Sequence, residues 1–425
     1  MSFAPERTDS WMLRTPLSWT SIFKSPVYAF QAWGWIGFAS AVFLSSWLAA
    51  ARGLYVPAVV FAAVVAALAF LLTALGRKVL TGEERLIFFQ EALAVFCAAA
   101  ILLYCLRLSI PLYLDVTALG VGTFLVFGRI GCFTVGCCHG RPARHGVRYR
   151  TEHSEAGFPS HFVGVRLFPV QIVESVFVAC VVSAGAILFL RQSPPGGVFS
   201  FYIVAYSFGR FWMELARGDS GRPYLGSFSE AQWTSLLLSI SVACAERFKV
   251  LPWSRWHWTI PLSIAVAMLL LGIHRRFDRA QRFELMHPLH VRELAEILQR
   301  MDAPVYSGKG FSKSKDPFQR IELHGTTSGL LISSARFSVS GPRTLHFSVS
   351  RQPRPLELRQ VRRLAILISR LLCMGATIDV TPGASGVFHI LFAISKENTR
   401  RVFQETRASG LTAASGVPTR RIGRV

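Results

Sequence analysis

The sequence predicts an all-α polytopic membrane bundle of about seven to eight transmembrane helices with a small C-terminal soluble α+β domain. Of the 425 residues, 52% are hydrophobic and 16% are charged, whereas an ordinary soluble domain carries about 25% charged residues. Apolar runs of roughly 20 residues, the length that crosses a bilayer, recur up to His274 and then stop. Before His274, this composition excludes a set of soluble domains, an intrinsically disordered chain and a disulfide scaffold.

Eight apolar segments are candidate membrane spans, because a hydrocarbon core of about 30 Å needs roughly 20 apolar residues. They lie at 31–50, 54–76, 86–107, 110–133, 169–190, 198–216, 230–247 and 257–273. The expected domain order is an N-terminal segment over 1–30, a transmembrane domain over 31–274 with a polar loop at 139–168, a basic soluble α+β domain over 275–404 and a disordered tail over 405–425.

The C-terminal domain is expected to be small and strongly basic. The 25 basic and 11 acidic residues after His274 account for most of the net charge of +22. Periodicity predicts helices over 291–301 and 356–372 and strands over 337–340, 344–350, 377–380 and 387–394. The second helix carries cations that can bind anionic lipid headgroups or nucleic acid, but a solvated face is preferred and no nucleic acid is expected. These cations are Arg359, Arg362, Arg363 and Arg370.

Charged residues inside apolar segments are the most informative ones. An arginine at membrane depth costs about 2.5–3.5 kcal/mol on insertion scales, so it needs a partner or a wet cavity. Intervals of four, four and three residues place a polar stripe on one helical face, formed by Tyr206, Arg210, Glu214 and Arg217. A guanidinium on this stripe is suited to holding a phosphate diester. The alternative is that Arg210 and Glu214 neutralise each other and only pack the bundle.

A second informative segment reads Gly-Arg-Ile-Gly-Cys-Phe-Thr-Val-Gly-Cys-Cys-His-Gly-Arg over residues 128–141. Its glycines leave room for a helix or a ligand to come close. Arg129 is a second cation at membrane depth. It can meet Arg210 around one anion, or it can pair with Glu174.

Cysteines in the same segment raise the question of a metal site. Zinc sites favour two cysteines separated by two to four residues with a second pair elsewhere, and haem attachment needs Cys-x-x-Cys-His. Neither pattern is present at Cys132, Cys137, Cys138 and His139. No metal and no cofactor is therefore expected, and a membrane thiol or metal protein built on this cluster is the minor alternative.

Four sequence blocks together resemble the prolipoprotein diacylglyceryl transferase family. The 128–141 segment is similar to the family signature Gly-Arg-(Ile/Leu)-Gly-Asn-Phe-x-Asn-Gly-Glu-x-x-Gly. Three further blocks follow in family order, namely Phe168-Pro169-Val170-Gln171-Ile172-Val173-Glu174, Tyr206-x-x-x-Arg210-Phe211-x-x-Glu214-x-x-Arg217 and Ser229-x-x-Gln232. Because the blocks agree in order as well as in residue type, the combined resemblance is specific, and it covers about residues 25–250.

The chain departs from the family pattern in two places. In the signature, Cys132, Val135 and Cys137 stand where the family has Asn, Asn and Glu. In the third apolar segment, the family's His-Gly-Gly motif falls opposite Phe89-Gln90-Glu91-Ala92. The histidine that is regarded as catalytic in the family is therefore replaced in this chain.

The resemblance implies a multi-pass transferase of the bacterial inner membrane. Its partners would be phosphatidylglycerol or a related anionic phospholipid and the lipobox cysteine of a prolipoprotein, which receives a diacylglyceryl group as glycerol phosphate leaves. The expected catalytic residues are Glu91, Arg129, His139, Tyr206 and Arg210. The expected substrate-binding residues are Gly128, Gly131, Arg141, Gln171, Glu174, Glu214, Arg217 and Gln232.

The identity of the base and of the acceptor stays open at this point. The incoming thiol must lose its proton to a base within hydrogen-bond reach. Glu91, Glu174 and His139 are the candidates, and Glu91 is preferred because it lies next to the position of the missing histidine. Two other functions are considered, a catalytically inactive lipid- or lipoprotein-binding relative and a phospholipid-dependent transferase with a different acceptor.

Overall fold

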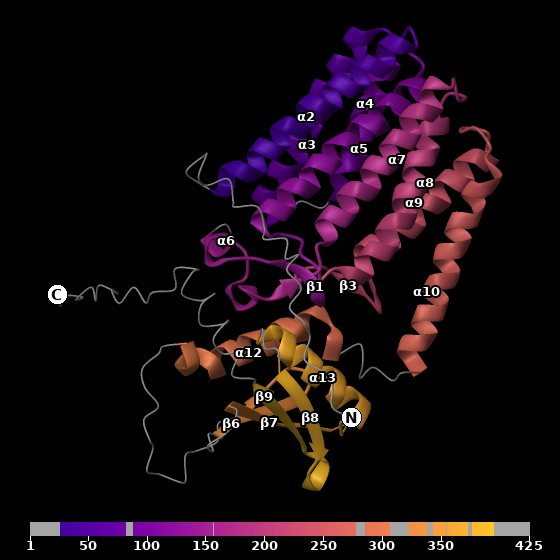
Figure 1. Ribbon diagram of the computed structural model, residues 1–425. Helices are drawn as coiled ribbons and strands as arrows, with labels where there is room; N and C mark the ends of the chain where they lie inside the picture. Colours follow the sequence, from indigo (N-terminus) through magenta and orange to yellow (C-terminus); the bar gives the residue numbers. More distant parts are fainter. Residues whose placement is uncertain are drawn as a thin grey trace, which may run out of the picture. The chain divides into compact units, whose positions relative to one another are not determined.

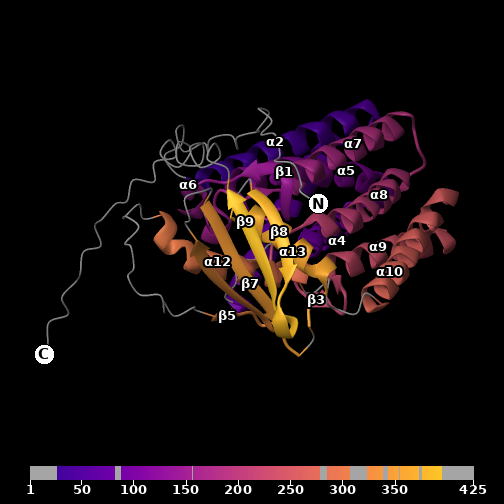
Figure 2. The same cartoon turned by 60° about the horizontal axis from the view of Figure 1, so that its bottom comes forward.

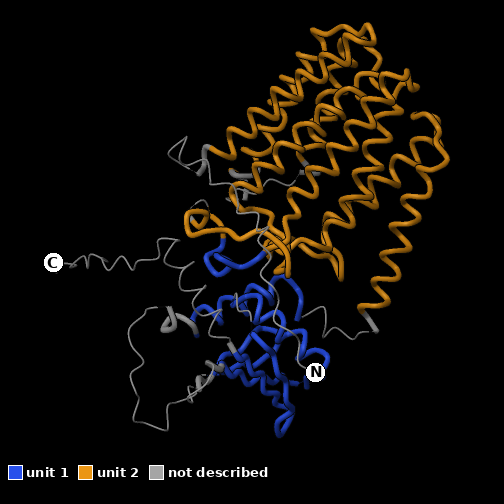
Figure 3. The backbone as a smooth tube through the Cα atoms, in the orientation of Figure 1, with its two compact units in different colours: residues 1–12, 159–166, 281–425 blue, residues 13–158, 167–280 orange. Residues whose placement is uncertain are grey.

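The computed structural model describes residues 26–81, 88–155, 157–277, 285–306, 323–337, 343–353, 355–372 and 376–394. The chain divides into two compact units (Figure 3). Among the described residues, those within 26–158 and 167–277 form the helical unit, and those within 159–166 and 285–394 form the sheet unit. The predicted N-terminal segment up to residue 25 and the predicted tail over 405–425 lie outside the described residues.

Each predicted apolar segment contains a helix of the helical unit (Figure 1). These helices are α2 (Pro26–Ala51), α3 (Val56–Thr81), α4 (Phe88–Cys105), α5 (Ile110–Val135), α7 (Val170–Leu190), α8 (Gly197–Met213), α9 (Glu230–Arg247) and α10 (Thr259–Phe277). The predicted class, a polytopic helical membrane bundle with a C-terminal α+β part, is confirmed.

In the described part of the chain, five helices are long and apolar enough to cross a membrane, which is fewer than the eight segments predicted. They are α2, α3, α5, α7 and α10, and α4 contributes a shorter apolar stretch. At 17 residues, α8 is somewhat shorter than the roughly 20 residues that a span needs. α9 is rich in Ser and carries Glu and Arg at its ends, which lowers its hydropathy.

Short elements join the helices of the helical unit. Between α5 and α7 lie β1 (Pro142–Arg148), α6 (Thr151–Glu155) and β2 (Arg166–Leu167). After α8 come the 3-10 helix η2 (Glu214–Ala216) and an antiparallel pair of strands, β3 (Tyr224–Leu225) and β4 (Phe228–Ser229). The 3-10 helix η3 (Arg255–Trp258) precedes α10. The predicted polar loop is therefore built from short regular elements.

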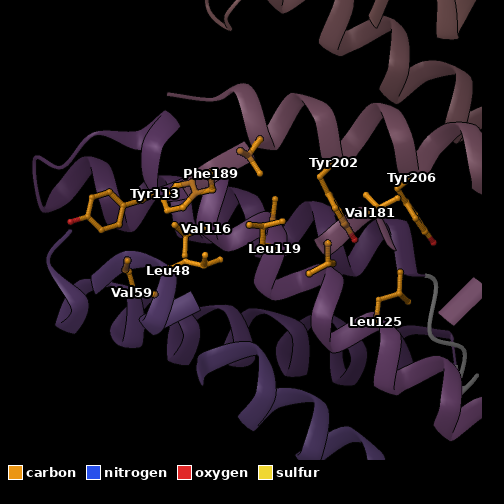
Figure 4. Packing of buried hydrophobic residues seen from close by; sticks show 14 of the residues in the cluster. Leu48, Val59, Tyr113, Val116, Leu119, Leu125, Val181, Phe189, Tyr202 and Tyr206 are labelled. Atoms are coloured by element: carbon orange, nitrogen blue, oxygen red, sulfur yellow. The ribbon is translucent and has the colours of Figure 1, made fainter. Parts of the chain in front are cut away.

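Helix α5 is the centre of the helical unit, where it packs against α2, α7 and α8. Pro111 lies in its first turn, where a missing N–H costs nothing, and Gly136 ends it in the left-handed conformation (φ 82°). Its Val116 and Leu119 lie in a core cluster that also includes Tyr202 (Figure 4). Gly122 allows this packing, because a Cβ there would lie 2.7 Å from the Tyr202 ring.

Asp115 is the buried carboxylate of α5, and it caps the start of α8. Its two oxygens accept hydrogen bonds from the backbone N–H groups of Gly196 at 2.8 Å and Phe199 at 2.7 Å. The first N–H groups of a helix have no partner within the helix, and they carry its positive dipole end. A charge inside an apolar segment is thus explained by helix capping.

The sheet unit contains one five-stranded antiparallel sheet with strand order β5-β6-β7-β9-β8 (Figure 2). Its elements are α12 (Pro288–Tyr306), β5 (Leu323–Gly325), β6 (Leu330–Phe337), β7 (Arg343–Arg351), α13 (Leu358–Leu371), β8 (Ala376–Pro382), the 3-10 helix η4 (Ala384–Gly386) and β9 (Phe388–Ile394). Alternate residues of β7 and β9, such as Phe347 and Phe392, are buried, as are Leu364 and Ile368 of α13. The alternation shows that one face of the sheet forms a core.

Sequence periodicity predicted both helices and three strands of the sheet unit correctly, but it misplaced β6 and missed β5. The strand predicted at 337–340 is observed at Leu330–Phe337, and residues 338–342 lie outside the described chain. β6 opens with three consecutive apolar residues and then two serines, so the alternation that marks a half-buried strand is weak. The four arginines predicted on a solvated face, Arg359, Arg362, Arg363 and Arg370, are all exposed.

The segment Pro159–Arg166 belongs to the sheet unit although it lies between β1 and α7 in the sequence. It contains the 3-10 helix η1 (Ser160–Phe162), which packs against α12. His161 Nδ1 lies 3.8 Å from Glu296 Oε1. Phe162 and Val165 are buried.

We predict that the α8 cap contributes measurably to stability. Asp115→Leu should lower the free energy of unfolding by about 1–3 kcal/mol for each amide left unpaired. Asp115→Asn should cost less, because one amide oxygen remains as an acceptor. Thermal unfolding in detergent measures both effects, with Thr117→Ala as the control, because the Thr117 hydroxyl bonds within its own helix. Equal melting temperatures for Asp115→Leu and Thr117→Ala would contradict the prediction.

Candidate active site

Arg129, Glu174 and Tyr206 form a buried polar triad between α5, α7 and α8. Arg129 Nε lies 3.0 Å from Glu174 Oε2, and the Tyr206 hydroxyl donates to Glu174 Oε1 at 3.1 Å. All three side chains are buried. Tyr206 also stacks on Tyr202 with the two rings nearly parallel, as Figure 4 shows. Of the two arrangements considered for Arg129, the structure contains the pair with Glu174.

A second charged network begins at the end of α8. Arg210 Nη1 lies 2.8 Å from Glu214 Oε2, and Arg222 Nη1 donates to Glu214 Oε1. Arg217 binds Asp219 in a two-pronged pair at 2.9 and 2.8 Å. Arg222 Nε lies 3.4 Å from Asp219 Oδ2 and therefore joins the two halves of the network.

The charges of this network do not cancel. Three guanidiniums, those of Arg210, Arg217 and Arg222, share the two carboxylates of Glu214 and Asp219. Three positive and two negative charges leave a surplus of one positive charge in a largely buried group. Such a surplus is costly unless an anion occupies the neighbourhood.

The turn over 139–141 is held against the chain after α8. The Gly218 N–H donates to the His139 carbonyl at 2.9 Å, and the Arg141 N–H donates to the Ala216 carbonyl at 3.0 Å. Gly140 has no room for a side chain, because a Cβ would lie 2.2 Å from the Phe168 carbonyl oxygen. Burial lowers the pKa of the His139 imidazole below its usual value of 6.5. Burial thus favours the neutral form of His139.

Three thiols meet at the end of α5. The sulfur atoms of Cys132, Cys137 and Cys138 all lie within 4.8 Å of one another. The positive φ angles of Gly136 (82°) and Cys138 (54°) turn the chain back toward the last turn of the helix. Hydrogen bonds from the Cys132 and Cys137 thiols, and then the charges of nearby arginines, hold the pKa of Cys138 well below its usual range.

Comparison with known proteins decides the family. The model of the prolipoprotein diacylglyceryl transferase family matches residues 19–245, which is more than half of the chain. The chain belongs to this family. It is a multi-pass membrane protein.

Several relatives carry the name phosphatidylglycerol–prolipoprotein diacylglyceryl transferase. The protein of that name from Clostridium tetani (strain Massachusetts / E88) is 32% identical over 158 residues, which cover 36% of this chain and 61% of the relative. A second such transferase, from Clostridium perfringens (strain 13 / Type A), is 31% identical over 134 residues, covering 30% of this chain and 47% of the relative. The matched part therefore spans about half to three-fifths of these relatives' length.

Most of the site residues expected from the family signature lie around the two polar networks. Arg141 donates through Nε to the Arg217 carbonyl at 3.2 Å. Gln171 is buried on α7, where its Nε2 donates to the Cys137 carbonyl at 2.8 Å. Gly131 packs under Phe30 and Trp33, whereas Gly128 faces open space. Gly131 is thus a packing glycine, and Gly128 leaves space beside Arg129.

Two expected residues have a different local role. Gln232 Oε1 accepts the Ser229 N–H at 3.1 Å and so caps α9. Among the described residues its Nε2 is buried without a hydrogen-bond partner, so this nitrogen is the part that can serve a substrate. Glu91, on α4, accepts a hydrogen bond from Thr73 of α3. That contact ties Glu91 to α3, and its role as a base stays a prediction.

Asp219 and Arg222 are members of the network that sequence reasoning did not select. They follow α8 in the run Arg217-Gly218-Asp219-Ser220-Gly221-Arg222, outside any apolar segment. The feature of the sequence that could have identified them is the high density of charged residues directly after Arg210 and Glu214. Because no helical periodicity applies to a loop, the spacing alone does not reveal that Arg222 returns to Glu214.

We predict that the buried Arg129–Glu174 pair depends on both charges. Glu174→Gln should lower stability by about 3–5 kcal/mol, because it leaves a buried guanidinium without its carboxylate. Thermal unfolding of the purified protein in detergent measures the loss. The control is Arg191→Gln, which removes an exposed charge at the end of α7. The double variant Glu174→Gln with Arg129→Gln should recover part of the stability, and failure to do so would argue against the charge explanation.

Proposed function

We propose that this chain is a phosphatidylglycerol–prolipoprotein diacylglyceryl transferase of the bacterial inner membrane. It transfers a diacylglyceryl group from phosphatidylglycerol to a cysteine thiol of a prolipoprotein, and glycerol phosphate leaves. Family membership and the names of the relatives support this proposal. The observation that carries it is the positive surplus of the arginine network at the end of α8.

A phosphodiester fits this surplus in charge. Phosphatidylglycerol carries a single negative charge on its phosphate, which balances the one excess guanidinium. Tyr206 donates to Glu174, the partner of Arg129, and it lies on α8 one helical turn before Arg210. A planar guanidinium can donate two parallel hydrogen bonds to phosphate oxygens, and a buried setting strengthens them.

The same cations serve the chemical step. The acceptor thiolate attacks the glyceryl carbon, an S–C bond forms, and the C–O bond to phosphate breaks with its electron pair on the phosphate oxygen. Negative charge therefore grows on the leaving glycerol phosphate. Arg129 and Arg210, held in place by their carboxylates, are preorganised to stabilise that charge without reorganising solvent.

We predict that Arg210 and Arg129 are needed as guanidiniums, beyond their positive charge. Arg210→Ala or Arg129→Ala should reduce transfer or phosphatidylglycerol affinity by roughly ten- to a hundredfold or more, since a charge-assisted hydrogen bond contributes about 1.5–3 kcal/mol. The lysine variants keep the charge but lose the two-pronged donor, so they should also lose activity. Transfer from radiolabelled phosphatidylglycerol to a lipobox peptide measures the effect, with exposed Arg247→Lys as the control.

If the role of Arg210 is purely structural, the opposite effect on activity is expected. If Arg210 only neutralises Glu214, the double variant Arg210→Met with Glu214→Leu should fold, bind phosphatidylglycerol and transfer normally. Such a result would overturn the proposed clamp. Phospholipid binding by the wild-type protein without any transfer to a lipobox peptide would instead identify an inactive relative or a different acceptor.

A further inference from the structure

The Cys132, Cys137 and Cys138 thiols, called here the thiol triad, have the arrangement of a preformed site. All three are free cysteines, and their sulfur atoms lie within 4.8 Å of one another. They come from a segment of seven residues, in which the left-handed turns at Gly136 and Cys138 bring the last two sulfurs back to the first. The spacing of these cysteines in the sequence does not match a known metal-binding motif. Their sulfur atoms come together only because of the conformation of the turn.

The turn that carries the triad is fixed from several directions. Gln171 Nε2 of α7 holds the Cys137 carbonyl at 2.8 Å, and the Gly218 N–H holds the His139 carbonyl at 2.9 Å. Tyr149 and Phe158 pack over Gly136, where a Cβ would come within 2.7 Å of the Phe158 ring. A site held this firmly loses little conformational entropy when it binds a ligand.

Three thiolates at this separation suit a zinc ion. Zn–S bonds are about 2.3 Å long, so a tetrahedral zinc holds its sulfurs about 3.8 Å apart, which needs only a small contraction of the triad. Three thiolates and one Zn²⁺ carry a net charge of −1. Arg129 and Arg217 lie close enough to Cys138 to favour its thiolate form. Zinc with three protein ligands keeps a fourth position open, as catalytic zinc sites do.

We propose that the thiol triad binds one zinc ion whose fourth coordination position receives the cysteine thiol of the acceptor. The identification of this fourth zinc ligand as the acceptor thiol rests on the proposed transferase function. Cys137 is exposed while Cys132 and Cys138 are partly buried, so the triad is accessible from one side. We assign a thiol to the fourth position because zinc binds thiolate ligands well, and the three protein ligands are already thiolates.

The proposal gives the acceptor thiol a way to lose its proton that does not depend on the candidate bases. Glu174 is committed to Arg129 and Tyr206, Glu91 accepts from Thr73, and His139 Nδ1 contacts the Gly140 carbonyl oxygen. A metal ion removes the need for a strong base, because a thiol that coordinates zinc loses its proton. The zinc-bound sulfur can still act as a nucleophile toward carbon.

The atoms and charges balance in this sequence. The acceptor thiol replaces water on zinc, a Zn–S bond forms, and the thiol proton passes to solvent water. The sulfur then attacks the glyceryl carbon, and the C–O electron pair leaves with glycerol phosphate. The product thioether is neutral and a weak ligand, so the Zn–S bond breaks and water returns. No atom is oxidised or reduced.

Cobalt(II) is the probe that tests the site, because it reports both ligand type and geometry. Metal-free, reduced full-length protein in detergent should bind one cobalt per chain with sulfur-to-cobalt charge-transfer bands and tetrahedral ligand-field bands. Cys137→Ser, and independently Cys138→Ser, should weaken binding by more than about a hundredfold, beyond the 10- to 100-fold typical of losing only a second-shell partner. Cys180→Ser, which changes an exposed thiol on α7, is the matched control and should bind as the wild type does.

Addition of a lipobox peptide should then shift the ligand-field bands, whereas the same peptide with serine in place of cysteine should not. Absence of sulfur-bound cobalt in the wild type, or equal binding by Cys137→Ser and Cys180→Ser, overturns the proposal. Full transfer activity in metal-free protein overturns it too, while the proposed transferase function stands. Cobalt binding with a thiol-dependent shift but no transfer supports the thiol site and overturns the proposed function instead.

Discussion

Pairing of buried guanidiniums is the constraint on which the helical unit depends. Arg129, Arg210, Arg217 and Arg222 lie in a largely apolar unit, and each is paired with a carboxylate. An unpaired charge is costly in a medium of low dielectric, so the Arg129–Glu174 pair, with Tyr206 bound to the same carboxylate, constrains where α5, α7 and α8 can lie relative to one another. Folding of the helical unit therefore depends on the charged residues of the candidate active site. Substitutions of these residues are expected to change both stability and activity.

Helix α5 connects the core to this chemistry. At its beginning Asp115 caps α8, in its middle Gly122 admits Tyr202, and near its end Arg129 meets Glu174. Its last turn carries Cys132 of the thiol triad. A helix that packs against several neighbours along its length can hold groups from different parts of the chain at fixed separations, which is what a preorganised site requires.

The sequence predicted correctly those features that depend on overall composition or on the geometry of a single helix. Hydropathy placed a helix in each apolar segment, and helical spacing put Arg210 and Glu214 on one face. It could not choose between two partners for Arg129, because that choice depends on how α5 packs against α7. Nor could it bring Arg222 back to Glu214, since a loop has no repeating geometry from which a contact can be inferred.

The place of Pro159–Arg166 in the sheet unit has a consequence for how the protein can be divided. The sheet unit is discontinuous in sequence, since this insert leaves the helical unit's chain and returns to it before α7. The 3-10 helix η1 of this insert, which includes the buried Phe162, packs against α12 of the sheet unit. A protein shortened after α10 would lack α12 and would leave η1 without this packing partner, so a clean separation into two independently folding pieces would require the insert to be redesigned as well.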